Sequence, residues 1–396
     1  MKVSGVTLGF LSMQSRFIGS IRGRLSALDT RKAFRHGGHE RDSLLGRILV
    51  LDPASACYKE LESAGYEVTS ERGMSDDELE QVLPEYDAVI IRSANRVTRS
   101  MLIGSPRVAV VGRAGSGVDN IDLEAASELG VPVVNAPTGN AGSVAELVVG
   151  LMLGVSRSIP SAHETMGRGE WAKKNFNGRT LNGKTLGIIG FGSVGQALAK
   201  LAVAFGMVVL LAEGITRPPD SGGKHENDTP LSKRTAVARE LGVTLPPLPL
   251  EELLSKSDFL SVHCPLTAET KGMISARELA LMKPSSVVIN TARGGIVDEK
   301  ALLHTLEEGQ LRGAVLDVFE CERSPLQDHV VNLCSLPNVL CTPHIGGSTE
   351  EAGECVLSEV CGAVVDSLEG TLPPSKIVNG NPDKNLRLER LRNWRS

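Results

Sequence analysis

From Arg47 onward, short apolar runs alternate with segments that have helical periodicity. The runs are rich in branched residues and carry few polar positions, which is typical of strands buried on both faces of a parallel sheet. Because the predicted strands are more numerous than one sheet would usually hold, we expect two doubly wound α/β domains. The strands are predicted at 48–51, 88–91, 108–111, 131–134, 185–189, 207–211, 259–262, 286–289, 314–316 and 339–341.

Two segments stand apart from this alternation. A helical pattern over residues 143–157 lies between the two series of strands and is suited to connect the domains. Residues 214–240 contain the charged, turn-forming run Pro218-Pro219-Asp220-Ser221-Gly222-Gly223-Lys224 and predict a long mobile surface insertion.

Every uncharged stretch is well short of the roughly 18 apolar residues that a membrane span needs, so a transmembrane protein is not expected.

Composition and charge narrow the class of protein. The 396 residues are 41% hydrophobic and 22% charged, a globular mixture that suits two or three domains. The formal net charge is −5, and because both termini are basic, the body between them is clearly acidic. An acidic body with only 3% aromatic residues argues against a nucleic-acid-binding surface. The seven cysteines include no CxxC pair, which argues against a disulfide scaffold or a zinc site and favours reduced thiols.

The two ends are predicted to lie outside the folded domains. Residues 1–28 contain four basic residues and no acid, a composition shared by organelle transit peptides and unstructured basic arms. We therefore expect 1–45 to be a disordered or targeting extension and 381–396 to be a solvated basic tail. The predicted location is the cytoplasm, with a mitochondrion or plastid as the alternative.

The first chemical motif is the glycine-rich run Gly190-Phe191-Gly192-Ser193-Val194-Gly195. An apolar strand leads into it and an amphipathic helix over 194–205 leaves it, so bare amides at a helix N-terminus can stabilise a pyrophosphate. Glu213 ends the next strand, where a carboxylate can bind a ribose diol and repel a 2′-phosphate. The motif therefore predicts a dinucleotide site that prefers NAD over NADP, although Arg217 lies close by.

The second motif, residues 290–299, follows a predicted strand and contains Arg293 before two glycines. Ligands of open α/β sheets bind at the carboxyl ends of the strands. A guanidinium at such an edge suits a planar carboxylate, which it can hold with two hydrogen bonds. The alternative is a surface salt bridge.

The third and fourth motifs, residues 316–322 and 341–348, also follow short apolar strands. His344 stands between Pro343 and two glycines, and a histidine can take a proton from an alcohol when a carboxylate orients it. Glu322 and its near neighbour Glu320 are both candidates for that carboxylate. His263, at another strand end, is the rival base, and a purely structural role for any one of these histidines stays open.

Together with the runs 90–93, 111–120 and 181–187, these motifs resemble the D-isomer-specific 2-hydroxyacid dehydrogenases over about residues 46–380. The resemblance implies a Rossmann cofactor domain inserted into a flavodoxin-like substrate domain. It assigns 46–144 and 344–380 to the substrate domain and 145–343 to the NAD-binding domain. It also implies that the chain ends without the regulatory domains of longer relatives.

The resemblance also implies roles for individual residues. Arg293 would hold the substrate carboxylate, His344 would transfer the proton, and Glu322 would be its partner; no metal is implied. Asp317 and the backbone around Thr291 would orient the nicotinamide amide. NAD contacts are implied for Gly190, Phe191, Gly192, Ser193, Val194, Gly195, Glu213, His263, Cys264, Pro265, Thr291, Ala292, Arg293, Asp317, His344 and Gly346. Substrate contacts are implied for Arg92, Ser93, Arg113, Ala114, Gly115, Arg293 and His344.

Among the members of this family, the chain is most similar to those that act on a phosphorylated 2-hydroxy acid. Arg92 and Arg113 would add two cations to Arg293, which suits a second anionic group on the substrate. The implied activity is NAD-dependent oxidation of 3-phospho-D-glycerate to 3-phosphohydroxypyruvate, the first step of phosphorylated L-serine biosynthesis. Alternatives are a hydroxypyruvate or glyoxylate reductase and a nucleotide-sensing corepressor. The family implies a homodimer or homotetramer, in which Lys173 and Lys174 could add positive charge from a neighbouring subunit.

Some positions depart from the family pattern. Glu213-Gly214 replaces the usual Asp-Pro, which should retain the preference for NAD. The insertion after Glu213 is longer than in close relatives. The run from Cys321 to Pro325 lacks the usual Glu-Glu-Pro-Pro, so the role of Glu322 depends on its spacing from Asp317.

Overall fold

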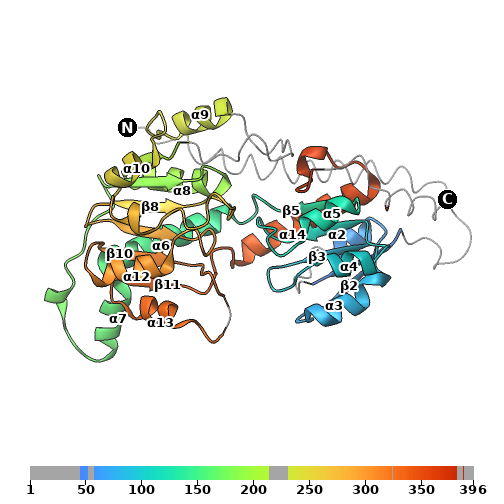
Figure 1. Ribbon diagram of the computed structural model, residues 1–396, viewed down its shortest axis with the longest axis horizontal. Helices are drawn as coiled ribbons and strands as arrows, with labels where there is room; N and C mark the ends of the chain where they lie inside the picture. The colour runs from blue at the N-terminus through green and yellow to red at the C-terminus, as the bar shows by residue number, and fades with distance from the viewer. Residues whose placement is uncertain (1–44, 52–57, 214–230, 323, 381–386, 388–396) are drawn as a thin grey trace, which may run out of the picture. The chain divides into compact units, whose positions relative to one another are not determined.

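The computed structural model describes residues 45–51, 58–213, 231–322, 324–380 and 387. They form two parallel β-sheets, each flanked by helices (Figure 1). The predicted class, two doubly wound parallel α/β domains, is confirmed. The predictions made for residues 1–44, for 214–230 and for most of 381–396 lie outside the described residues.

The first sheet has the strand order β2-β1-β3-β4-β5, which is the flavodoxin order. The prediction missed β2, whose sequence Glu-Val-Thr-Ser has one apolar residue in four and whose end residues are exposed because the strand lies at the edge of the sheet. The central strand β3 is buried throughout. The strands are β1 (Arg47–Val50), β2 (Glu67–Ser70), β3 (Ala88–Ile91), β4 (Val110–Arg113) and β5 (Val133–Asn135), and the helices between them are α2 (Tyr58–Ser63), α3 (Asp76–Val82), α4 (Arg99–Gly104) and α5 (Leu123–Glu128).

The second sheet has the strand order β11-β10-β9-β8-β6-β7. An isolated parallel bridge between Ala212 and Leu248 lies just beyond β7. Counted as one more strand position beside β7, it gives the Rossmann strand order. The direction of winding reverses between β6 and β8, where ligands of such sheets bind. Its strands are β6 (Thr185–Ile189), β7 (Val208–Leu211), β8 (Phe259–Val262), β9 (Val287–Asn290), β10 (Gly313–Leu316) and β11 (Val339–Cys341), with helices α8 (Ser193–Ala204), α9 (Leu231–Glu240), α10 (Leu250–Lys256), α11 (Ala276–Leu279), α12 (Glu299–Glu307) and α13 (Asp328–Ser335).

Two long helices complete the cores of the two sheets. Helix α6 (Ala141–Arg157) packs against α8, and its Val148 and Met152 share a core with residues of β6. Helix α14 (Glu350–Glu369) returns to the first sheet, where its Val360 and Val364 pack against β4. The packing is close, because a Cβ at Gly112 would lie 2.8 Å from Val364. The last long helix of the described chain therefore belongs to the sheet in which the described chain begins.

The prediction that 214–240 is a surface insertion is wrong for residues 231–240, which form helix α9. Ala238 on this helix is fully buried in the core that contains Val209 and Leu211. The sequence gives little sign of the helix, because a small residue makes this contact. A second correction concerns Arg387 in the predicted solvated tail: its buried guanidinium donates hydrogen bonds to carbonyl groups of Leu102, Ser105 and Val108.

Among the described residues, no single helix is both long enough and apolar enough to cross a membrane. Helix α6 and the following α7 (Ile159–Gly167) meet the criterion together by length and composition alone, with a bend of 63° between them.

The packing of α14 on the first sheet predicts that Leu357 supports this lobe. Leu357 is fully buried, so Leu357→Ala should lower the free energy of unfolding by about 2–5 kcal/mol through lost contacts and a cavity. Glu354→Ala, an exposed position on the same helix, is the matched control. Urea titration followed by circular dichroism measures both; equal, small effects would contradict the packing.

Candidate functional site

The glycine-rich turn lies where β6 meets β8. Gly190 has a φ of +94°, and a Cβ there would lie 2.6 Å from the carbonyl carbon of His263. The amide of His263 donates to the carbonyl of Ile189 over 2.7 Å. Only glycine therefore allows the end of β6 to approach β8 this closely.

The N-terminus of α8 is open above Gly192. Gly192 is the N-cap of this helix, makes no side-chain cap, and would place a Cβ within 4 Å of no atom. Free amides at the positive end of a 12-residue helix form a site for an anion. This space fits the pyrophosphate of a dinucleotide.

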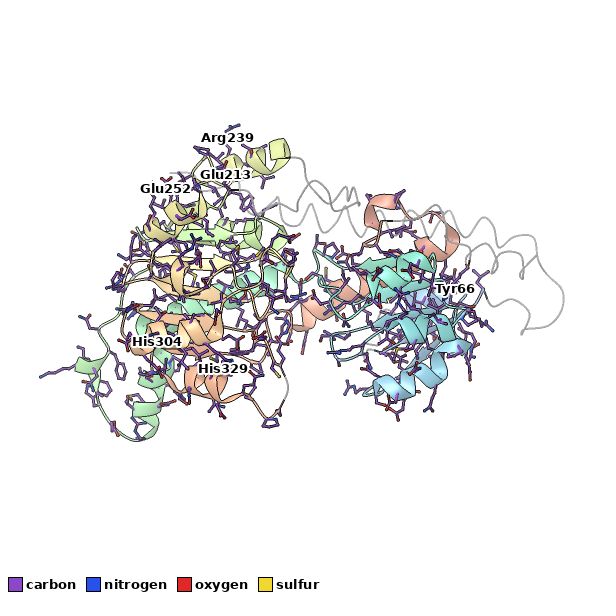
Figure 2. All side chains as sticks on the ribbon, in the orientation of Figure 1. Tyr66, Glu213, Arg239, Glu252, His304 and His329 are labelled. Atoms are coloured by element: carbon purple, nitrogen blue, oxygen red, sulfur yellow. The ribbon has the colours of Figure 1, made fainter. Side chains whose placement is uncertain are left out.

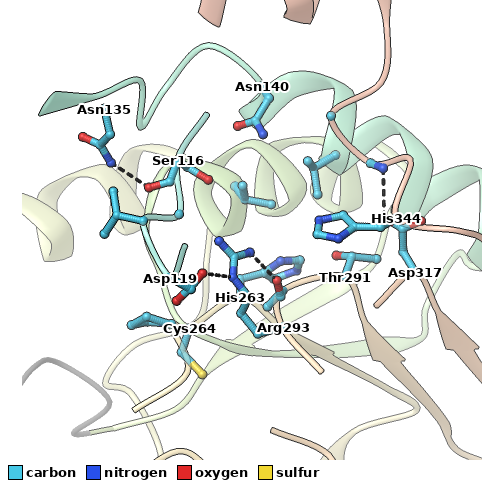
Figure 3. A pocket seen from close by; sticks show the side chains of 18 of the residues that line it. Ser116, Asp119, Asn135, Asn140, His263, Cys264, Thr291, Arg293, Asp317 and His344 are labelled. Atoms are coloured by element: carbon cyan, nitrogen blue, oxygen red, sulfur yellow. Dashed lines mark hydrogen bonds and ion pairs between the residues drawn. The ribbon is translucent and has the colours of Figure 1, made fainter. Parts of the chain in front are cut away.

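A cavity of about 330 Å³ lies beside this turn (Figure 3). Two of its lining side chains carry buried atoms without a hydrogen-bond partner in the described protein, Oγ1 of Thr291 and Oδ1 of Asn140. Buried polar atoms are normally paired, so these two atoms are suited to bind a ligand. The predicted residues that line the cavity are Val194, His263, Cys264, Pro265, Thr291, Ala292, Arg293, Asp317, His344 and Gly346.

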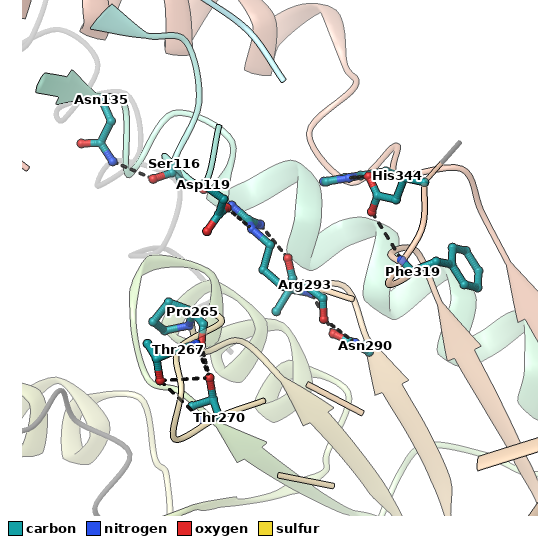
Figure 4. A network of polar contacts seen from close by, with 12 residues as sticks. Ser116, Asp119, Asn135, Pro265, Thr267, Thr270, Asn290, Arg293, Phe319 and His344 are labelled. Atoms are coloured by element: carbon teal, nitrogen blue, oxygen red, sulfur yellow. Dashed lines mark hydrogen bonds and ion pairs between the residues drawn. The ribbon is translucent and has the colours of Figure 1, made fainter. Parts of the chain in front are cut away.

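Arg293 follows β9 and its guanidinium lines the cavity (Figure 3). Its Nε donates to Oδ2 of Asp119 over 2.6 Å, and its Nη1 donates to the carbonyl of Ala292 over 2.6 Å (Figure 4). Its Nη2 has no protein partner among the described residues, and a Cβ at Gly117 would overlap it. Two contacts thus orient the group while Nη2 stays available to an anion.

His344 and Glu322 form a hydrogen-bonded pair. Nδ1 of His344 lies 2.8 Å from Oε2 of Glu322, and each side chain is 40% exposed. Burial alone would raise the pKa of Glu322, but the hydrogen bond and charge of His344, the amide of Phe319 and the charge of Arg293 outweigh burial and lower it. Glu322 rather than Glu320 is therefore the carboxylate that contacts the histidine, and it stays ionised at neutral pH.

Asp317 holds the loop that carries His344. Its carboxylate accepts hydrogen bonds from the hydroxyl of Thr342 and from the amides of Ile345 and Gly346, at 2.6–2.8 Å. His344 adopts a φ of +54°, a left-handed conformation that residues other than glycine adopt only uncommonly. The buried carboxylate of Asp317 offsets the cost of this turn by supplying an acceptor to each of these donors. The role implied for Asp317 toward the nicotinamide amide stays a prediction.

His263, the rival base, lies in the same cavity but in a different setting. Its Nε2 is 2.8 Å from the hydroxyl of Ser261. Burial lowers the pKa of His263 to about 4, so the ring is neutral over the physiological range. No carboxylate is bonded to it within the described chain, whereas His344 has Glu322.

Arg113 and Arg92 lie near Arg293 but do not line the cavity. Burial and the positive charges of Arg293 and Arg92 lower the pKa of Arg113 to about 10, while Asp119 acts in the opposite direction. The buried Nε of Arg113 has no hydrogen-bond partner in the described chain. Arg113 is thus a buried guanidinium beside two other positive charges, a setting in which an anionic ligand would be stabilised.

Several predicted residues lie away from the cavity lining. Glu213 is exposed after the end of β7, on the far side of β6 from β8 (Figure 2). Glu322 contacts His344 from outside the lining. The others outside it are Gly190, Phe191, Gly192, Ser193, Gly195, Arg92, Ser93, Arg113, Ala114 and Gly115.

Other residues of the site were missed by the sequence analysis. Asp119, the partner of Arg293, is 174 residues distant in the chain. Its signal was present, since it stands in the polar end of the run 111–120. Asn140, which precedes α6, carried no comparable signal. In the described part of the chain, no cluster of three or more His, Cys, Asp or Glu side chains could hold a metal ion.

Comparison with known proteins agrees with this geometry. The model of the D-isomer specific 2-hydroxyacid dehydrogenase NAD binding domain matches residues 149–346, and proteins of this class match most of the chain. The chain belongs to the D-isomer specific 2-hydroxyacid dehydrogenase family. The prediction of NAD as the cofactor is thereby confirmed.

Two curated relatives and one solved structure illustrate the range of the family. The D-3-phosphoglycerate dehydrogenase of Methanocaldococcus jannaschii is 42% identical over 82% of this chain, and the match spans 58% of that relative's length. The hydroxypyruvate reductase of Thermotoga maritima is 42% identical over 72% of this chain and 86% of its own. The crystal structure of an Aquifex aeolicus D-lactate dehydrogenase with NAD and lactic acid has a TM-score of 0.71 and 26% identity, covering 84% of this chain and 99% of that one.

The open space above Gly192 predicts a selective loss of cofactor binding. Gly192→Ala adds a methyl group that meets no protein atom, so the melting temperature should stay within about 2 °C while the Kd for NADH rises about 10-fold or more. Gly353→Ala, where a Cβ also meets no atom, is the control. NADH fluorescence titration measures the effect; unchanged affinity in Gly192→Ala would place the pyrophosphate elsewhere.

Proposed function

We propose that this chain oxidises 3-phospho-D-glycerate to 3-phosphohydroxypyruvate with NAD, the first step of phosphorylated L-serine biosynthesis. The observation that carries the proposal is the group of Arg92, Arg113 and Arg293 near the hydrogen-bonded pair of His344 and Glu322. Curated relatives named D-3-phosphoglycerate dehydrogenase, from Methanocaldococcus jannaschii and Rattus norvegicus, support it at 42% and 40% identity. The chain spans 58% and 57% of the length of these two relatives.

The charges at the site suit a substrate with two anionic groups. The buried guanidinium of Arg113 feels the positive charges of Arg293 and Arg92, and Asp119 is the one carboxylate among the described residues that acts on it in the opposite direction. 3-Phosphoglycerate carries a carboxylate at the reacting end and a phosphate at the other. Arg293 would hold the carboxylate, and Arg113 and Arg92 would hold the phosphate.

The residues divide the reaction between them. NAD supplies the acceptor for the hydride that leaves the substrate carbon. Nδ1 of His344 is bonded to Glu322, so Nε2 is the ring nitrogen left to take the hydroxyl proton. The ionised Glu322 stabilises the imidazolium that this transfer forms, and Arg293 stabilises negative charge on the reacting oxygen. The carbonyl of the product forms as the proton and the hydride leave.

A reductase for hydroxypyruvate is the second candidate. It is favoured by the Thermotoga maritima hydroxypyruvate reductase, of which the chain covers 86% at 42% identity. Such an enzyme uses the same histidine and arginine chemistry but needs no phosphate site. The two candidates therefore differ in what Arg92 and Arg113 do.

Further assignments belong to the same proposal. We assign NAD binding to residues 145–343, with Glu213 on the ribose, and substrate binding to 46–144 and 344–380. A homodimer or homotetramer is supported by apolar side chains exposed in and after α7, including Met166 at 55% and Trp171 at 81%. We assign the cytoplasm as the location, with a mitochondrion or plastid as the alternative.

The two histidines should respond differently to replacement. His344→Gln should lower kcat about 10²–10⁴-fold because it removes the proton acceptor, with NADH affinity near that of the wild type. His263 is already neutral above pH 5, since its pKa is about 4, so His263→Gln should leave the acidic limb of the kcat/KM profile in place. Glu322, whose pKa is lowered, loses its charge only as the pH falls below the usual glutamate range, so it should set no limb above pH 5. Steady-state kinetics from pH 5 to 9 test this; a severe loss in His263→Gln with a mild one in His344→Gln would reverse the assignment.

Substrate preference tests the role of the two further arginines. With NADH, Arg113→Gln should lower kcat/KM for 3-phosphohydroxypyruvate about 10–100-fold, the effect of losing charged hydrogen bonds, and should change the value for hydroxypyruvate much less. Arg96→Gln removes the same charge from an exposed position in the same lobe and should affect neither substrate. Equal losses on both substrates in Arg113→Gln would remove the phosphate assignment and favour the reductase.

A further inference from the structure

Glu299 is a buried carboxylate that the reaction described above does not use. It is the last residue of the motif that carries Arg293 and the first residue of α12, and it is 6% exposed. The amide of Glu320 donates to its Oε1 over 2.6 Å, and Nε2 of His329 on α13 lies 3.1 Å from its Oε2. Both carboxylate oxygens are therefore in contact with the protein.

The contact with Glu320 fixes the loop that carries Glu322. This loop leaves β10 after Leu316, and Glu320 stands two residues before the carboxylate that meets His344. The loop also packs closely on Gly294, because a Cβ there would overlap the peptide between Phe319 and Glu320. Glu322 itself accepts one further hydrogen bond in the described chain, a long one of 3.4 Å from the amide of Phe319. The shortest hydrogen bond that holds the backbone of residues 319–322 within the described chain is thus the 2.6 Å bond to Glu299.

A buried carboxylate at position 299 destabilises the folded protein unless its oxygens accept hydrogen bonds from buried donors. Burying an ionised group costs free energy that an apolar side chain of similar size would not. The two hydrogen-bonded contacts of Glu299 offset this free energy. One joins Glu299 to the backbone amide of Glu320, and the other joins it to His329 on α13. An apolar residue at 299 would fill the space but leave the amide of Glu320 without its partner.

We propose that Glu299, braced by His329, is a positioning residue that holds Glu322 where its carboxylate meets Nδ1 of His344. Glu299 binds the amide of Glu320, and this bond fixes the backbone that carries Glu322. Glu322 in turn contacts the imidazole of His344. The kinetic consequence rests on the proposed function, whereas the geometric consequence concerns the pair of His344 and Glu322 in the protein alone. Neither Glu299 nor His329 contacts the reacting atoms.

The geometric consequence is measured by NMR of the full chain labelled with ¹³C in the histidine rings. The ring signal of His344, assigned by its absence in His344→Gln, should move in Glu299→Ala toward its position in Glu322→Gln. Glu299→Gln keeps an acceptor for Glu320 and should restore most of the wild-type position. Glu278→Ala is the matched control, since Glu278 is also 6% exposed and bonded to backbone and hydroxyl groups, but on α11. If Glu299→Ala does not fold, His329→Phe carries the test and should give a smaller shift in the same direction.

The kinetic consequence is a double-mutant cycle. Glu299→Ala should lower kcat about 10–100-fold, as supporting residues of a catalytic group typically do, with NADH affinity retained. In the Glu322→Gln background, Glu299→Ala should lower kcat by less than about 3-fold, because the carboxylate that Glu299 positions is already absent. A wild-type ring signal in Glu299→Ala, or losses that multiply in the double variant, would overturn the proposal. If the chain turned over no 2-hydroxy acid, the proposed function would fail while the ring signals still decided the role of Glu299.

Discussion

The parallel direction of the strands in the second sheet is the constraint on which the site depends. Because β6, β8, β9, β10 and β11 all run the same way, their carboxyl ends meet at one edge. Gly190, His263, Arg293, Asp317 and His344 each follow one of these strands within four residues. The strands are apolar and buried, so the sheet fixes the chain while the residues just beyond it carry the chemistry. A cavity with these groups on its wall is the result.

Three carboxylates of the candidate site have different roles, and their hydrogen-bond partners decide which. Asp119 orients a guanidinium, Glu322 meets an imidazole, and Asp317 accepts from the hydroxyl and amides of a loop. Asp317 is 1% exposed, while the other two are in contact with water. The acceptor that holds the loop is thus buried beneath the site, and the carboxylates that contact Arg293 and His344 lie nearer the solvent. Glu299 belongs with Asp317 in this respect, since it too is buried and accepts from a backbone amide.

Much of the fold could be predicted because the central strands of a parallel sheet have sequences that are unbroken apolar runs. The strand over 259–262 was predicted with its observed limits, since all four residues are buried. The edge strand β2 and helix α9 were not predicted for the opposite reason, because three of the four residues of β2 are polar and α9 buries a small residue.

The candidate site shows the same division. Arg293 and His344 could be singled out because each follows a strand and stands among glycines. The residue pattern alone left Glu320 and Glu322 open, and the family resemblance favoured Glu322. The choice depends on which way a short loop turns: the amide of Glu320 faces Glu299, and the side chain of Glu322 faces His344. The pairing of Arg293 with Asp119 joins segments 174 residues apart, which no local pattern encodes.

The most direct test of the account follows the hydrogen itself. The purified protein is given NAD and 3-phospho-D-glycerate carrying deuterium at carbon 2, and the reduced cofactor is analysed by mass spectrometry. We predict that deuterium appears in the nicotinamide ring with the D isomer and not with the L isomer, because under the proposed function Arg293 and His344 would orient only the D isomer toward the cofactor. Reduced cofactor without deuterium, or equal transfer from both isomers, would contradict the account.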